Sequence, residues 1–330
     1  MIKLQFLDPT DEMPPKKTAY RLTNWPAYNQ ALIQRGSLTL WLDEQTIADW
    51  YHQGPNKPGG LLRYSDACIQ CALSLKAVFG LAFRQTQGLI HSLLEAMKLE
   101  LQTPSYCQLC RRQSVLHQAF VPPVASPTDS EAIHIVIDST GLKVYGEGEW
   151  KVRKHGADKR RTWRKLHLAL DEATGLIHAL ELTSNAQTDA EMVKPLLAAI
   201  KQPIRQLSGD GAYDQVKVYD ELEARTIPGV IPPRVNAVIW TDETGVDLVH
   251  ARNEALTQIE AVGLAAWKRQ SGYHRRSKAE TGMFRWKTIF GERLANRSLG
   301  HQQAEANIKA RCLNRMTQLG MPKAIRYNST

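Results

Sequence analysis

Residues 132–138 read Ala-Ile-His-Ile-Val-Ile-Asp, and Ile133, Ile135 and Ile137 alternate along this stretch. Alternate residues of a β-strand point to the same face, and a run that is apolar on both faces is typical of a strand buried within a sheet. The stretch therefore predicts a buried strand that ends at Asp138, with Asp138 on the face opposite to the isoleucines.

The residues that follow predict the rest of the same sheet. Residues 166–170 and 176–182 flank Asp-Glu-Ala-Thr-Gly at 171–175, a pattern typical of a β-hairpin. A helix is expected over 189–201, a strand over 204–207, and a further helix up to residue 224 after the motif Ser-Gly-Asp-Gly-Ala-Tyr-Asp at 208–214. Strands first, then alternating helix and strand, indicate an α/β sheet with one antiparallel strand.

Three acids are candidates for one site. Asp138 and Asp210 each follow a predicted strand, and groups at the carboxyl ends of neighbouring strands gather at one edge of a sheet. Glu280 is the third. Clustered carboxylates ionise readily only around a cation, and hard oxygen ligands suit Mg²⁺ or Mn²⁺. Two such ions activate an attacking oxygen and steady a leaving oxygen during displacement at a phosphodiester.

Glu280 lies within an unusual stretch, Tyr-His-Arg-Arg-Ser-Lys-Ala-Glu-Thr-Gly-Met-Phe-Arg-Trp-Lys at 273–287. If this stretch is helical, Tyr273, Arg276, Glu280 and Lys287 fall within an arc of roughly 60° on one face. Arg276 and Lys287 then suit flanking phosphates. Each acid also has an ordinary interpretation: Ser277 and Glu280 match a helix capping box, and Asp210 between two glycines matches a tight turn.

The charge of the chain favours a polyanionic partner. Its 330 residues carry a net charge of +9 with a pI near 9.3, and eight basic residues lie between residues 151 and 165. Candidate DNA contacts in that run are Lys154, Arg160 and Arg161.

Three helices with short breaks are predicted over 66–83, 85–98 and 105–116, and such a trio is typical of a helix-turn-helix unit. Arg111 and Arg112 on the third helix are candidate DNA contacts. The alternative is a plain helical bundle. Before the trio, prolines and turn residues predict a loosely organised N-terminal arm with short helical pieces.

Five cysteines without a signal sequence indicate reduced thiols, and no apolar window is long enough to span a membrane, so we expect a cytosolic protein. The spacings Cys68-x2-Cys71 and Cys107-x2-Cys110 match a zinc pattern, but both pairs lie in apolar helical runs. Core packing is the simpler account, and no zinc is expected.

The spacing Tyr273-x2-Arg276-x3-Glu280-x6-Lys287 resembles the Y-(2)-R-(3)-E-(6)-K signature of a group of bacterial insertion-sequence transposases of the DDE class. Residues 138–141 and 209–214 are similar to the motifs of that group around its first two acids. The resemblance extends over about residues 20–322 and includes His155-Gly156 and the motif Leu-Asn-Arg-Met at 313–316.

The resemblance implies an RNase H-like core behind a helical DNA-binding domain, with Asp138, Asp210 and Glu280 as the metal-binding triad and two Mg²⁺ or Mn²⁺ ions as cofactors. It also implies DNA strand cleavage and transfer at terminal inverted repeats, by a homodimer or higher oligomer on double-stranded DNA in the nucleoid. We expect an arm over 1–60, a helical domain over 61–125, a catalytic domain over 126–296, and a C-terminal helix and tail over 297–330. The alternatives are a non-catalytic DNA-binding regulator and a nuclease without strand transfer.

Overall fold

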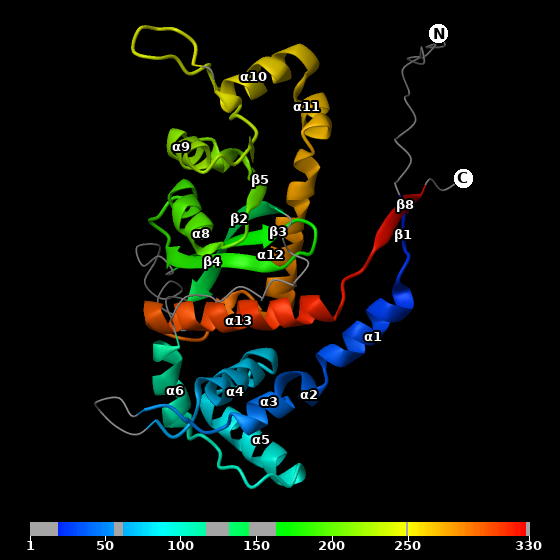
Figure 1. Cartoon of the computed structure of the whole chain (residues 1–330), viewed down its shortest axis with the longest axis vertical. Helices are drawn as coiled ribbons and strands as arrows, with labels where there is room; N and C mark the ends of the chain where they lie inside the picture. Colours follow the sequence, from blue (N-terminus) through cyan, green and yellow to red (C-terminus); the bar gives the residue numbers. More distant parts are fainter. Residues whose placement is uncertain (1–18, 56–61, 117–131, 145–162, 249, 328–330) are drawn as a thin grey trace, which may run out of the picture.

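The computed structural model of the chain describes residues 19–55, 62–116, 132–144, 163–248 and 250–327. Figure 1 shows a central sheet (green) with helices on both faces, next to a separate layer of helices from the N-terminal third of the chain (blue to cyan). The long helix α13 (Leu299–Leu319) runs between the sheet and this helical layer.

The sheet has the strand order β4-β3-β2-β5-β6, and β7 pairs with the far end of β2. β3 runs antiparallel to both of its neighbours, whereas β5 is parallel to β2 and β6 is parallel to β5. The strands are β2 (Ile133–Val144), β3 (Trp163–Asp171), β4 (Ile177–Ser184), β5 (Ile204–Ser208), β6 (Gly229–Val230) and β7 (Arg293–Leu294). The predicted mixed α/β sheet with one antiparallel strand is confirmed.

Asp138 does not end its strand, so that prediction is wrong. β2 continues beyond Asp138 to Val144, because β3 pairs with it as far as Lys143 and β7 pairs with Lys143 and Val144. The predicted orientation is correct, since Ile135 and Ile137 pack in one core and Val136 packs in the core on the opposite side. Asp138 therefore lies in the middle of a long central strand.

The helices that cover the two faces explain these two cores. On the Asp138 side, α12 (Ser277–Phe290) contacts β2 and β3, and α13 contacts β4. On the other side lie α8 (Val193–Ala199), which continues the 3₁₀ turn η1 (Ala190–Met192), and α9 (Val216–Ala224). The helices predicted over 189–201 and up to residue 224 are thus confirmed, with slightly different ends.

The predicted trio of helices is also confirmed, as α4 (Asp66–Val78), α5 (Phe83–Ala96) and α6 (Tyr106–Val115). Ser65 and Ser105 cap the first and third of them by accepting hydrogen bonds from backbone amides. Within the described ranges no single helix is long and apolar enough to cross a membrane, and only the pair α4 and α5, bent by 112°, passes the same test by length and composition.

The N-terminal residues are better packed than predicted. The helices α1 (Trp25–Arg35), α2 (Leu38–Trp41) and α3 (Glu44–Ala48) precede α4, and Trp41 and Trp50 are 2% and 1% exposed in the core of the helical layer. The Trp50 indole donates to the carbonyl of Gln102 at 2.8 Å. The expectation of a loosely organised arm is therefore wrong for residues 41–50.

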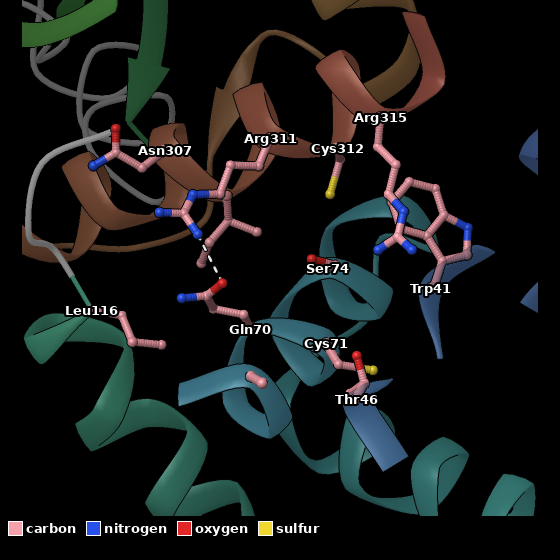
Figure 2. A pocket seen from close by; sticks show the side chains of 12 residues that line it. Trp41, Thr46, Gln70, Cys71, Ser74, Leu116, Asn307, Arg311, Cys312 and Arg315 are labelled. Atoms are coloured by element: carbon pink, nitrogen blue, oxygen red, sulfur yellow. Dashed lines mark hydrogen bonds between the residues drawn. The ribbon is translucent and has the colours of Figure 1, made fainter. Parts of the chain in front are cut away.

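Helix α13 joins the two halves of the molecule. Asn314 bonds to both the amide and the carbonyl of Ile177 at 2.8 Å, which fixes the helix on the sheet. On its other side Arg311 donates to Gln70 of α4 at 2.7 Å across a cavity of about 230 Å³ (Figure 2). Helix α13 thus connects the helical layer to the sheet, and α12 also contacts α4.

The five cysteines fall into two groups. Cys68, Cys71 and Cys312 are buried in the core of the helical layer, and burial raises the pKa of Cys71 and of Cys312 to about 12. Core packing is therefore correct for the first pair. It is wrong for the second pair, because Cys107 is exposed and Cys110 is only partly buried.

Candidate active site

The parallel pairing of β2 with β5 brings the first two acids together. Val136 and Ser208 are the last residues that pair between these strands, so Asp138 and Asp210 each lie two residues beyond that pair. Asp210 begins the 3₁₀ turn η2 (Gly211–Tyr213), where its Oδ1 accepts a hydrogen bond from the Ala212 amide at 2.9 Å. The ordinary interpretation of Asp210 as a turn residue is thus also correct, and one oxygen of its carboxylate is held by the backbone.

Glu280 comes from the first turn of α12, which packs on the sheet through buried Ala279, Met283 and Trp286. The helix begins at Ser277, and the preceding turn η3 (Tyr273–Arg276) is a 3₁₀ helix. The capping-box interpretation is wrong, because the residue that precedes the helix is Arg276 and no side chain caps it. The carboxylate of Glu280 is therefore available to another partner.

That partner is Arg276, which lies between two of the acids. Its Nη2 is 2.5 Å from Oε1 of Glu280, and its Nη1 is 3.6 Å from Oδ2 of Asp138. Its guanidinium also lies over the ring of Tyr273, 5.8 Å from the ring centroid. Tyr273, Arg276 and Glu280 therefore share one side of this segment, as predicted, although η3 and α12 are different kinds of helix.

The electrostatics of Asp138 reflect this crowding. Burial raises the pKa of Asp138, and the negative charges of Asp210 and Glu280 raise it further. The amide of Ser139 and the guanidinium of Arg276 oppose the shift. The site is thus a partly buried cluster of negative charge in which Arg276 is the cation that lowers the pKa of Asp138.

A divalent ion fits the donor set, although the side chains are not yet gathered around one point. Among the described residues, no group of three or more His, Cys, Asp or Glu side chains is close enough to hold a metal ion. The guanidinium of Arg276 occupies the space between Asp138 and Glu280 instead. Carboxylate oxygens are the hard ligands that Mg²⁺ and Mn²⁺ prefer, so the chemistry of the three acids fits such an ion.

The other candidate DNA contacts lie apart from the acids. Lys287 is seven residues along α12 from Glu280, on the same stripe of the helix. The hydrogen bond and charge of Lys143 lower the pKa of Glu292, and the charge of Lys287 adds to this effect. Arg111 is exposed on α6 and donates a 3.4 Å hydrogen bond to the Cys107 carbonyl. Three further candidates lie outside the described residues: Lys154, Arg160 and Arg161.

Arg112 is already bound within the protein. It donates to the carbonyl of Tyr64 at 3.0 Å and forms an ion pair with Asp66, and its side chain is only 14% exposed. In this conformation Arg112 joins α6 to the start of α4 and does not present its charge to DNA.

A second polar cluster, which the sequence did not reveal, lies close to Tyr213 of the turn η2. His167 of β3 bonds to Thr183 at 3.0 Å and lies 3.4 Å from Asp189, which also pairs with Lys165 at 3.1 Å. Burial lowers the pKa of His167 to about 4, so the ring is neutral at neutral pH. The only signal in the sequence was Asp189, which the pattern assigned to the start of a helix.

Gly282 determines how closely the helix that carries Glu280 approaches the sheet. A Cβ atom at Gly282 would lie 2.5 Å from Cδ2 of Leu170, which is buried in β3. We expect Gly282→Val to destabilise the protein by about 1–3 kcal/mol, as overpacking of a core does. Urea unfolding measures the effect. The matched control is Gly88→Val in the middle of α5, where the added Cβ meets nothing within 4 Å; equal stability losses in the two variants would contradict this account of Gly282.

Two family models with the same description, a transposase DDE domain, match the chain, over residues 33–147 and 129–316. Several solved structures are similar, each at low identity. The piggyBac transposase synaptic complex with hairpin DNA is 11% identical, with a TM-score of 0.37 over 86% of this chain and 75% of that chain. A pre-cleavage Mos1 transpososome is 12% identical, with a TM-score of 0.22 over 82% of each chain. A Mos1 mariner paired-end complex with Mn is 11% identical, with a TM-score of 0.22 over 88% of this chain and 86% of that chain. Likenesses this loose add no support for a site or a partner.

The second family model spans more than half of the chain and contains Asp138, Asp210 and Glu280. The chain therefore belongs to the family of DDE transposases, enzymes that use divalent metal ions to cleave DNA strands and transfer them.

Proposed function

We propose that Asp138, Asp210 and Glu280 are the metal-binding triad of this transposase and hold two Mg²⁺ or Mn²⁺ ions. The observation that carries the proposal is the contact of Arg276 with both Asp138 and Glu280. These contacts lie next to the end of β5, which pairs with β2 and leads to Asp210. Three acids from distant parts of the chain thus lie close enough for the charges of Asp210 and Glu280 to act on Asp138. The spacing from Tyr273 to Lys287 supports our proposal that the enzyme is a member of the Y-(2)-R-(3)-E-(6)-K group.

The side chains of this site have distinct tasks. The three carboxylates would supply hard oxygen ligands for divalent ions, and ions held there would supply activation of the attacking water or 3′-hydroxyl and stabilisation of the leaving oxygen. Arg276 and Lys287 hold the phosphates that flank the scissile bond, Arg276 through its forked donors and Lys287 as a point charge. Tyr273 lies against the guanidinium of Arg276 and restricts its orientation.

The DNA that this enzyme acts on is the pair of terminal inverted repeats of its own mobile element. We propose that the helical layer binds these ends through exposed groups such as Arg111, and that the basic run with Lys154, Arg160 and Arg161 contacts phosphates nearer the site. A dimer or higher oligomer holds both ends on the bacterial nucleoid, because the two ends are cut together. A net charge of +9 supports the binding of such a polyanion.

The direct test uses the full chain, labelled duplexes that carry the inverted repeats flanking its gene, a target plasmid, and Mg²⁺ or Mn²⁺. We expect cleavage at the element boundary and labelled DNA joined to the plasmid, with neither product in EDTA. Cleavage without joining would instead support a nuclease, and binding without cleavage would support a regulator. A duplex with scrambled repeats is the control for sequence-specific binding.

A further inference from the structure

We infer that Asp214, Arg234 and Arg252 form a clamp that positions Asp210 relative to Glu280. The inference rests on the proposed function, since it concerns the geometry of the proposed metal site. None of the three side chains is a proposed metal ligand, and all three act on the turn that follows Asp210. They are positioning residues.

The centre of the clamp is a buried ion pair. Arg252 Nε donates to Oδ1 of Asp214 at 2.6 Å and Nη2 donates to Oδ2 at 3.4 Å, and the two side chains are 4% and 2% exposed. Nη1 of Arg252 donates to the carbonyl of Val238 at 2.7 Å, and the guanidinium lies 4.1 Å from the ring centroid of Trp240. A buried charge pair with both partners hydrogen-bonded holds its geometry firmly, because separating the charges would leave each one unpaired.

Arg234 closes the clamp from the surface. Its amide donates to Oδ2 of Asp214 at 3.0 Å, and its guanidinium donates to the carbonyls of Gly211 at 3.2 Å and Ala212 at 3.4 Å. The two carbonyls belong to η2, the turn that Asp210 begins. Arg234 therefore holds the backbone of the turn, and both arginines hold the side chain of Asp214, which directly follows it.

The turn η2 also fixes the Asp210 carboxylate. Oδ1 of Asp210 accepts a hydrogen bond from the Ala212 amide at 2.9 Å. A rotation of the peptides at Gly211 and Ala212 would move this amide and, with it, Oδ1 of Asp210. The carbonyls that Arg234 holds belong to these same residues. Metal affinity depends on such supporting contacts, and their loss typically weakens binding about 10–100-fold.

The clamp also joins Asp210 to the helices that carry Glu280. Arg252 lies in the first turn of α10 (Ala251–Val262), which packs on α11 (Leu264–Gln270). α11 packs on η3, and η3 leads directly into α12 and Glu280. Figure 1 shows α10, α11 and α12 in gold to orange. The ion pair of Asp214 with Arg252 thus connects the turn after Asp210 to α10, the first of the helices that lead to Glu280.

The residues between Arg234 and Arg252 hold the clamp in place. Trp240, His250 and Tyr219 of α9 form a cluster of rings with centroids 5.1–5.5 Å apart. Asn253 bonds to both the amide and the carbonyl of Trp240, at 2.9 and 2.8 Å. Trp240 and His250 are therefore anchored against α9 and α10.

The experiment compares Arg234→Ala and Arg252→Lys with the native protein. Arg234 is exposed, so its loss leaves the core intact, and Arg252→Lys keeps a buried positive charge without the forked donors. Mn²⁺ binding, followed by electron paramagnetic resonance on the full chain with and without terminal-repeat DNA, is expected to weaken by about tenfold or more in both variants. The affinity for the same DNA without metal is expected to stay unchanged.

Arg225→Ala is the matched control, because Arg225 pairs with Glu221 at the end of α9 and makes no contact to η2 among the described residues. If the native protein binds Mn²⁺ and Arg234→Ala, correctly folded by circular dichroism, binds it with native affinity, the clamp does not position Asp210. If the native protein binds no Mn²⁺ under either condition, the proposed metal site itself fails. If Arg252→Lys unfolds, Arg234→Ala alone decides the question.

Discussion

Replacement of Asp138 by Asn is expected to abolish DNA cleavage, and Asp210→Asn and Glu280→Gln are expected to do the same. Each amide keeps the shape of the acid but lacks the negative charge that attracts a divalent ion. The loss of a supporting contact costs a metal site about 10–100-fold, so the loss of a ligand should exceed the upper end of that range. Single-turnover cleavage of labelled terminal-repeat DNA in Mg²⁺ measures the effect.

Two controls separate loss of chemistry from loss of folding or DNA binding. Because burial and two neighbouring acids raise the pKa of Asp138, its charge is unfavourable in the folded protein, and Asp138→Asn should melt no lower than the native protein. DNA binding without metal should also be preserved, since the lost charges repel phosphates. Asp220→Asn on the exposed side of α9 is the matched control and should cleave normally. Full activity in one of the three variants would remove that acid from the site.

The strands of the core could be predicted because their signals are local. Ile133, Ile135 and Ile137 alternate within one strand, and the hairpin around Gly175 is read from adjacent residues. The continuation of β2 beyond Asp138 could not be predicted in this way. Residues 139–141 are polar or glycine and look like the start of a loop. They are held in the strand by their β3 partners, residues 165–167, which come 24 to 28 positions later in the chain.

The packing of the N-terminal residues could not be predicted for the same reason. The prolines and turn residues near Trp41 and Trp50 indicated a loose segment, and the helix that covers the pocket beside Trp41 is α13, more than 250 residues away in the chain. Figure 2 shows Arg315 of that helix beside the Trp41 ring. Burial that depends on a distant partner leaves little trace in the local pattern.

The sequence proposes the residues of the candidate site but says less about the contacts between them. A period of 3.6 residues placed Arg276 next to Glu280, and the structure has this pair. The contact of Arg276 with Asp138 and the pair of Asp214 with Arg252 depend on tertiary packing. Sequence spacing cannot report such contacts, because it says nothing about how α12 packs on the sheet or how α10 approaches Asp214.

Arg276→Met is expected to have two opposite effects, because Arg276 contacts the acids in the metal-free protein and is proposed to hold phosphate during the reaction. Removal of the guanidinium should strengthen Mn²⁺ binding to the DNA-free protein by about tenfold or more, since an opposite-charge pair about 4 Å apart near a protein surface interacts by roughly 4 kcal/mol before hydration is counted. Cleavage should fall by about 100-fold, as it does when one preorganised donor to a transition state is lost. Calorimetric titration with Mn²⁺ and single-turnover cleavage measure the two effects.

The neighbouring Arg275 provides the control for charge alone. Arg275 is 56% exposed and pairs with Glu172 at 3.6 Å, away from Asp138 and Glu280. Arg275→Met removes the same charge from the same turn, so both variants should lose a similar part of their general attraction to DNA. Only Arg276→Met should bind Mn²⁺ more tightly, because only Arg276 lies between the two acids. Native Mn²⁺ affinity in Arg276→Met would mean that the guanidinium does not compete with a metal ion, and native cleavage would mean that it does not hold the reacting phosphate.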